Sequence, residues 1–99
     1  MSTLRISAAA EDDLVGIWSY IAQDSPSTAD VFLARLRDVC SALAHSPGMG
    51  RPRDELRLGV RSFAIGMYLV FYREIPGGIE VVRVLSGFLD LPQHFGHPP

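Results

Sequence analysis

The chain contains no lysine, because all nine of its basic residues are arginine. A guanidinium group stays protonated near neutral pH, so histidine is the only basic residue type here that can exchange protons in that range. Cysteine is almost as scarce. Cys40 stands alone, which excludes an internal disulfide and a metal site built from cysteines. The three histidines are dispersed, with no carboxylate at ligand spacing, and no glycine-rich phosphate loop is present. We therefore expect neither a metal nor a cofactor.

Long hydrophobic runs are also lacking. No segment approaches the ~20 apolar residues that cross a bilayer, and the first residues do not resemble a signal peptide. The net charge of −2 gives no general attraction to polyanions. We expect a cytoplasmic protein that binds neither membranes nor nucleic acid directly. With 99 residues, 47% of them hydrophobic, the chain should form one domain over residues 1–99 with its own core.

The most apolar part of the chain lies between residues 60 and 85 and predicts a sheet. It holds three runs of β-branched, aromatic and aliphatic residues, separated by glycine or by Pro76-Gly77-Gly78, a connector that favours an antiparallel hairpin. A short alternating segment near the N-terminus suits an edge strand. The expected strands are Leu4 to Ser7, Val60 to Ile65, Met67 to Tyr72 and Ile79 to Leu85.

Two amphipathic helices should cover this sheet. Three acidic residues and an apolar spacing of three and four predict a helix from Ala9 to Ala22. Ser25 as N-cap and Pro26 at the first position begin a second helix of nearly twenty residues. The short linker makes the two an antiparallel hairpin. We expect an α+β fold of order β-α-α-β-β-β, in which the helical hairpin packs on a small, mostly antiparallel sheet. Residues 46–53 form a connector, and residues 86–95 a turn and one short helix.

Several segments together resemble a known family. They are DLVGIWSYIAQDSP, GRPRDELRLGVRSF, YLVFYRE and GIEVVRVLSGFLDLPQHF, preceded by an acidic helix start, in this order along residues 4–95. The chain is identified as resembling the RelE/ParE superfamily of bacterial toxins, and more specifically its ParE-type branch. The resemblance implies the toxin of a type II toxin–antitoxin pair, neutralised by a cognate antitoxin that folds onto it. For the ParE branch it implies DNA gyrase as the target, and for the RelE branch ribosome-dependent cleavage of mRNA.

Residue chemistry bears on the choice between these branches. Arg61 and Arg83 lie in strands, close to where ribonuclease members place phosphate-binding arginines, and their side chains share a face if the strand register allows it. In the alternative interpretation, their stems cover apolar sheet while their charged heads stay in water. Proton transfer is poorly provided for, because the connector lysines and the C-terminal tyrosine of RelE-like members have no counterpart here. We therefore favour an inhibitor without catalytic residues over an endonuclease.

An inhibitor needs a binding surface, and binding hot spots favour arginine and aromatic residues. For Phe88 and Phe95, a structural role in pinning the last segment onto the sheet is the open alternative. The generous apolar content of the helices suggests a groove for the antitoxin. The candidate target-binding residues are Arg51, Arg53, Arg61, Arg83, Phe88 and Phe95, and the candidate antitoxin-binding residues are Trp18, Phe32 and Leu36.

Overall fold

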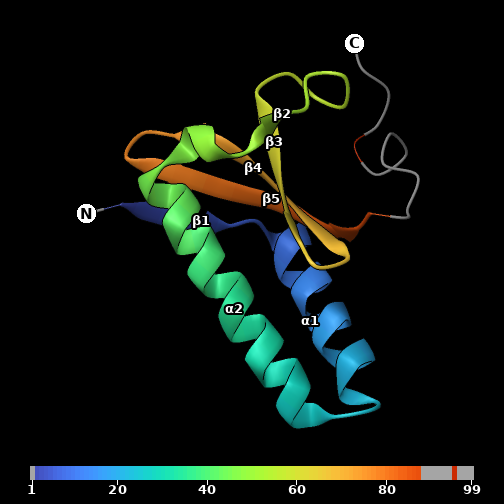
Figure 1. The fold of residues 1–99 in the computed structure, drawn as a ribbon. Helices are drawn as coiled ribbons and strands as arrows, with labels where there is room; N and C mark the ends of the chain where they lie inside the picture. Colours follow the sequence, from blue (N-terminus) through green and yellow to red (C-terminus); the bar gives the residue numbers. More distant parts are fainter. Residues whose placement is uncertain (1, 88–94, 96–99) are drawn as a thin grey trace.

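The computed structural model describes residues 2–87 and residue 95. Two helices lie together on one face of a five-stranded sheet, and their connection projects beyond it (Figure 1). The elements are β1 (Thr3–Ile6), α1 (Ala8–Ala22), α2 (Pro26–His45), the short 3-10 helix η1 (Pro47–Met49), β2 (Arg51–Pro52), β3 (Val60–Ile65), β4 (Tyr68–Ile75) and β5 (Gly78–Ser86). The predicted α+β order is confirmed, with β2 added inside the connector. The predicted C-terminal helix falls, except for Phe95, outside the described residues.

The strands are arranged in the order β1-β5-β4-β3-β2. The pairs β2–β3, β3–β4 and β4–β5 are antiparallel, whereas β1 runs parallel to β5. The predicted edge position of the first strand is therefore confirmed. No helix in the described part of the chain is long and apolar enough to cross a membrane.

Glycines set both hairpin turns. Gly77 has a φ of 81°, which position i+2 of a type II turn requires, and Pro76 supplies the fixed φ favoured at i+1. Gly66, with a φ of 59°, joins β3 to β4. The strand expected from Met67 to Tyr72 begins one residue later than predicted, so its predicted start is wrong. Met67 lies in the turn after Gly66 with 63% of its surface exposed, and β4 continues to Ile75.

Both helices begin at a serine cap. The Ser25 hydroxyl accepts a hydrogen bond from the Thr28 amide, as predicted, with Pro26 at the start of α2. The Ser7 hydroxyl plays the same role for Ala10 in α1, and it also donates to the Val82 carbonyl of β5. Ser7 therefore ties the start of α1 to the sheet.

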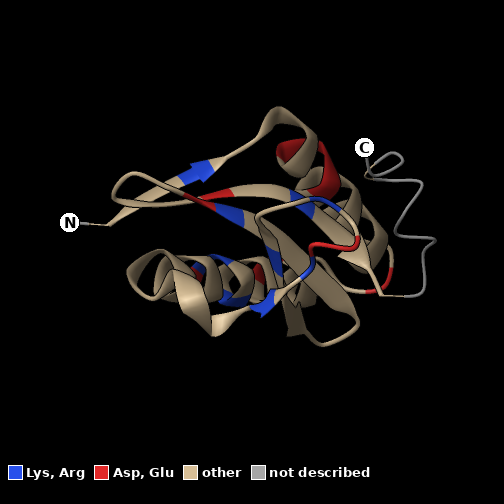
Figure 2. Ribbon diagram, turned by 90° about the horizontal axis from the view of Figure 1, so that it is seen from above, with Lys and Arg blue, Asp and Glu red and all other residues tan. Residues whose placement is uncertain are grey.

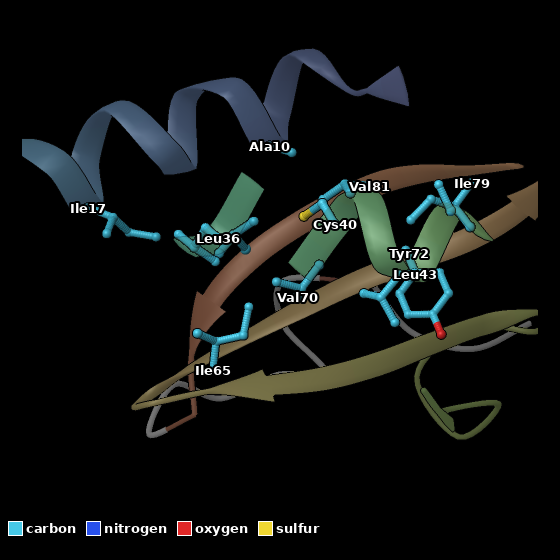
Figure 3. Close-up of a cluster of buried hydrophobic side chains, with 12 residues drawn as sticks. Ala10, Ile17, Leu36, Cys40, Leu43, Ile65, Val70, Tyr72, Ile79 and Val81 are labelled. Atoms are coloured by element: carbon cyan, nitrogen blue, oxygen red, sulfur yellow. The ribbon is translucent and has the colours of Figure 1, made fainter. Parts of the chain in front are cut away.

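The sheet buries side chains on both faces because successive residues of a strand point to opposite sides and both sets are apolar. Tyr72 belongs to the cluster beneath the helices, where it lies beside Leu43 at one end (Figure 3). Phe71, the preceding residue, belongs to a second cluster on the opposite face. The members of this second cluster are Leu56, Val60, Phe71, Val82, Leu85 and Phe95.

Candidate functional site

The face of the sheet opposite the helices carries an arginine loop, defined as residues 51–59. Arg53 lies over the Phe71 ring, with its guanidinium carbon 5.7 Å from the ring centroid, and it donates to Ser62 Oγ at 3.1 Å. Phe95 packs edge-on against the same ring at a centroid distance of 4.7 Å. Arg57 lies over the Phe95 ring at 5.3 Å. The arginine loop and Phe95 therefore meet around the Phe71 ring.

Phe95 is 6% exposed in this arrangement, so its ring serves to pin the chain onto the sheet. That is the structural alternative considered for it from the sequence. Its effect on the surface is indirect, because it supports the Arg57 guanidinium. Phe88, the other aromatic candidate, lies outside the described residues.

The start of the arginine loop is fixed from below by Tyr72. The Tyr72 hydroxyl donates to the Pro47 carbonyl at 2.6 Å and accepts from the Gly50 amide at 2.8 Å. Arg61 completes this anchor by donating to the Gly50 carbonyl at 2.8 Å. A side chain on residue 50 would collide with the Tyr72 ring, which explains the glycine there. Tyr72 and Arg61 therefore position the strand that presents Arg51.

We expect Tyr72→Phe to lower the free energy of unfolding by about 1–3 kcal/mol at pH 7, because the Pro47 carbonyl and the Gly50 amide each lose a partner. Burial raises the pKa of Tyr72 above its ordinary value, since the phenolate would lose its hydration. A raised folded-state pKa contributes stability below the unfolded pKa of about 10, and this contribution disappears at higher pH. Urea unfolding of the wild type and of Tyr72→Phe should therefore give a smaller difference in the free energy of unfolding at a pH above 10 than at pH 7. An equal difference at both pH values would contradict this account.

Arg83 lies apart from the arginine loop, in β5. Its Nε and Nη2 donate to the two carboxylate oxygens of Asp13 in α1, at 2.8 and 2.9 Å. Asp13 also accepts from the Val84 amide at 2.9 Å, where β5 extends past the end of β1. This pairing raises the pKa of Arg83 further above its already high ordinary value. Arg83 is thus committed to fastening α1 to the open edge of β5.

Arg61 and Arg83 were expected to share a face only if the strand register allowed it, and the register shift between β4 and β5 means that this condition is not met. Arg61 pairs across the strands with Tyr72, which faces the helices, whereas Arg83 pairs with Phe71, which faces away. The register shift between those two partners is the reason, because it breaks the simple alternation on which the sequence argument relied. The two arginines do not form one phosphate-binding pair.

In the described residues, arginine positions and acidic positions both occur along the helices, strands and loops (Figure 2). In the arginine loop, Arg53 pairs with Glu55 at 2.8 Å, and this hydrogen bond lowers the pKa of the Glu55 carboxyl. Arg51 is exposed, and within the described residues neither it nor Arg57 has a carboxylate at ion-pair distance. The loop is therefore only locally basic.

A second surface lies on the helical side, where α1 and α2 leave an interhelical groove. Its inner part is a hollow of about 210 Å³ over β1 and β5, and its outer part has a volume of about 420 Å³. The two parts share Glu11, Leu14, Leu33 and Arg37, so they are continuous. Other residues lining the groove are Leu4, Ile6, Leu36, Cys40, Val81 and Val84 in the inner part, and Val15, Trp18, Asp30 and Ala34 in the outer part.

The structure brings together two of the three candidate antitoxin-binding residues. Leu36 lines the bottom of the groove, and Trp18 lines its mouth with 39% of its surface exposed, donating from Nε1 to Asp30 at 2.8 Å. Phe32 lies elsewhere, against Tyr68 at a ring distance of 5.5 Å. Burial raises the pKa of Cys40 to about 11, so the one thiol at the groove is protonated at neutral pH and a weak nucleophile.

The sequence analysis missed the roles of Asp13, Tyr72 and Arg37. Asp13 and Arg83 are 70 positions apart, and nothing in their spacing indicates an ion pair. Arg37 is not one of the apolar residues of α2, yet it lines the groove. For Tyr72 a signal existed, because a tyrosine in a strand buried on both faces needs a partner for its hydroxyl.

Comparisons with known proteins agree with this architecture. The family model described as the ParE toxin of the type II toxin–antitoxin system parDE matches residues 4–87. Toxin ParE1 of Caulobacter vibrioides is 35% identical over 97 residues, which are 97% of this chain and 100% of that protein. Toxin ParE1 of Mycobacterium tuberculosis (strain H37Rv) is 33% identical over 95 residues, covering 94% of this chain and 97% of that protein.

Two solved structures share the fold. A chain of the chromosomal ParDE toxin–antitoxin system of P. aeruginosa matches with a TM-score of 0.72 at 20% identity, covering 87% of this chain and 96% of that one. A chain of the toxin–antitoxin complex RelBE2 of Mycobacterium tuberculosis matches with a TM-score of 0.58 at 22% identity, covering 86% and 96%. The family match over most of the sequence, together with relatives above 30% identity along nearly its whole length, shows that this chain belongs to the ParE toxin family of type II toxin–antitoxin systems.

Proposed function

We propose that this toxin inhibits DNA gyrase by binding it, without a chemical step of its own, and that a cognate antitoxin neutralises it. The observation that supports this mode of action is that both strand arginines, Arg61 and Arg83, already form hydrogen bonds within the fold. Arg83 is held by both oxygens of Asp13, and Arg61 donates to the Gly50 carbonyl. Side chains committed in this way to the fold are poor partners for the charge that develops on a phosphate during RNA cleavage.

Proton transfer is equally poorly supported in the described residues. The Tyr72 hydroxyl already bonds to Pro47 and Gly50, and burial raises its pKa. The Cys40 thiol has a pKa of about 11. General acid–base catalysis works best with a group whose pKa lies near the operating pH, and neither group meets that condition. Of the three histidines, His45 forms a hydrogen bond with Ser2 Oγ at the end of α2, and His94 and His97 lie outside the described residues.

We assign the antitoxin to the interhelical groove. The relatives of known structure come from a ParDE system and a RelBE2 complex, so an antitoxin partner is the natural expectation for this chain. The groove is lined mainly by apolar residues and carries the charged residues Glu11, Asp30 and Arg37. Those properties suit an amphipathic segment that lays an apolar row into the groove and pairs its own charges with the rim.

The proposal is tested with purified toxin and gyrase in a plasmid supercoiling assay, alongside translating ribosomes supplied with mRNA. We expect loss of supercoiling, intact mRNA, and restoration of supercoiling on addition of the antitoxin encoded by the neighbouring gene. Cleavage of mRNA with undisturbed gyrase would overturn the proposal in favour of a RelE-like endonuclease. Activity in neither assay would also overturn it.

A substitution in the interhelical groove tests whether the antitoxin binds there. Ala34 is exposed at the outer groove, so Ala34→Arg should block the groove without disturbing the core. We expect this variant to inhibit gyrase fully while the antitoxin binds it at least about 10-fold more weakly. Ala42→Arg, at an exposed position of α2 that does not line the groove, is the matched control. Equal antitoxin affinity of both variants would remove the groove assignment.

A further inference from the structure

Two leucines in the arginine loop have opposite surroundings. Leu56 is 4% exposed and packs into the cluster of Val60, Phe71 and Phe95. Leu58, two residues later, is 85% exposed, the highest value among the large exposed hydrophobic residues of the described chain. A single exposed leucine is common on protein surfaces and needs no explanation by itself. The way in which this one is held gives it significance.

The loop that carries Leu58 is closed by its own hydrogen bonds. The Arg53 amide donates to the Val60 carbonyl at 2.8 Å, and the Val60 amide donates to the Arg57 carbonyl at 3.2 Å. The Gly59 amide donates to Asp54 Oδ1 at 3.0 Å. Gly59 itself has a φ of 83°, a conformation that favours glycine. Leu56 anchors the loop from inside, so the backbone that carries Leu58 is held in place and loses little freedom on binding.

The charged residues near Leu58 in the sequence are mostly arginines. Arg57, its neighbour in sequence, has its guanidinium over the Phe95 ring and donates to the Phe95 carbonyl at 3.5 Å. Within the described residues no carboxylate pairs with it. Arg53, earlier in the loop, pairs with Glu55, and its side chain is only 14% exposed. From residue 51 to residue 61 there are four arginines and two carboxylates, so the surroundings of Leu58 are basic on balance.

The loop and the interhelical groove lie on different sides of the sheet. Leu56 packs with Phe71 on the face away from the helices, whereas the groove is lined by α1, α2 and the helix-facing residues of β5. Neither groove lining includes a residue of the loop. A partner in the groove therefore leaves Leu58 uncovered, and a partner on Leu58 leaves the groove open.

We propose that Leu58 is the apolar anchor of the target-binding surface, entering an apolar pocket of the target protein whose rim carries a carboxylate that meets Arg57. The inference rests on the proposed function, because it identifies the part of the toxin that contacts the inhibited protein. An exposed aliphatic side chain on a fixed backbone, next to an unpaired arginine, suits a protein pocket, since hot spots combine a desolvated centre with a polar rim. A nucleic acid partner would make use of the arginines and leave the leucine without a role.

The test compares Leu58→Ser with Val31→Ser, a matched loss of an exposed aliphatic residue on α2 that is 70% exposed. Both variants should keep the thermal midpoint of the wild-type protein, because neither side chain is part of the core. We expect Leu58→Ser to bind gyrase on the order of 10- to 100-fold more weakly, as removal of one buried aliphatic side chain implies. Val31→Ser should bind as the wild type does, Leu58→Met should restore most of the affinity, and antitoxin affinity should be unchanged in all three.

The outcomes separate this inference from the proposed function. If the wild-type toxin inhibits gyrase and Leu58→Ser binds it equally well, the inference is overturned and the proposed function stands. If the wild-type toxin does not bind gyrase but Leu58→Ser alone loses growth arrest on expression, gyrase is the wrong target and the role of Leu58 is supported. Undiminished growth arrest by Leu58→Ser, weakened antitoxin binding, or a loss of affinity for duplex DNA alone would each overturn the inference.

Discussion

Replacing Gly78 by alanine is expected to lower the free energy of unfolding by about 3 kcal/mol or more, because the new side chain has no space. Gly78 pairs with Thr3 where β1 runs parallel to β5. A Cβ there would overlap the Thr3 carbonyl oxygen and lie 2.6 and 2.7 Å from the carbonyl carbon and amide nitrogen of Thr3. All three are backbone atoms, so no rotation of a side chain relieves the collision. The first strand must move away from the sheet.

Displacement of β1 would also damage the interhelical groove, because Leu4 and Ile6 line its inner part. We therefore expect Gly78→Ala to weaken antitoxin binding along with stability. Urea unfolding measures the stability. Hydrogen exchange at the amides of Thr3 and Ser7, which donate to the Gly77 and Val81 carbonyls, reports the loss of the strand directly.

Gly16→Ala is the matched control for this substitution. Gly16 lies inside α1, and a Cβ at this position meets nothing within 4 Å. Alanine favours the helix over glycine, so this variant should be more stable by about 0.5–1 kcal/mol. The same chemical change thus has opposite signs at two glycines. A Gly78→Ala protein within about 0.5 kcal/mol of the wild type would contradict the close approach of β1 to β5.

Asp13→Ala should be the second most damaging change, at about 2–4 kcal/mol. It leaves the Arg83 guanidinium and the Val84 amide without their acceptor, in a place where the side chains of Asp13 and Arg83 are only 13% and 24% exposed. An isolated charge of that kind costs more than the pair itself contributes. Asp12→Ala removes a neighbouring, exposed carboxylate and should stay within about 0.5 kcal/mol of the wild type.

A double-mutant cycle of Asp13→Ala and Arg83→Ala separates a fastening role for Arg83 from a role in target binding. We expect a coupling energy of about 1–3 kcal/mol in urea unfolding, because each side chain acts through the other. Arg83→Ala should impair gyrase inhibition only as far as it lowers the folded fraction. Full folding of Arg83→Ala at the assay temperature, combined with lost inhibition, would instead show that Arg83 contacts the target.

The helices and most strands could be predicted because their signals are local. Ser25 and Pro26 begin α2 through their own hydroxyl and ring geometry, and the pair Pro76-Gly77 makes a turn wherever it is placed. Strand β2 was missed for the converse reason. Arg51 and Pro52 have no strand propensity that sets them apart, and they become a strand only because β3 lies beside them.

The candidate site was less predictable than the fold. Arg61 and Arg83 were identified as interesting residues, but the side of the sheet that each occupies depends on the register shift at Phe71. The exposed Leu58 and the buried Leu56 belong to the same short loop, and their sequence context does not distinguish them. Only the docking of Leu56 against Phe71 and Phe95 determines which leucine remains in water.

The sequence by itself determined the helical hairpin, the β-rich hairpins and the family, because each depends on residues near one another in the chain or on segments in a fixed order. The tertiary structure decided which arginines hold the fold together and which stay available to a partner. Arg83 is taken up by Asp13, whereas Arg57 is left beside Leu58 at the surface. The physical reason is that an ion pair or a buried side chain depends on distances between elements. Those distances are set when the elements pack against one another, and the linear sequence does not show them.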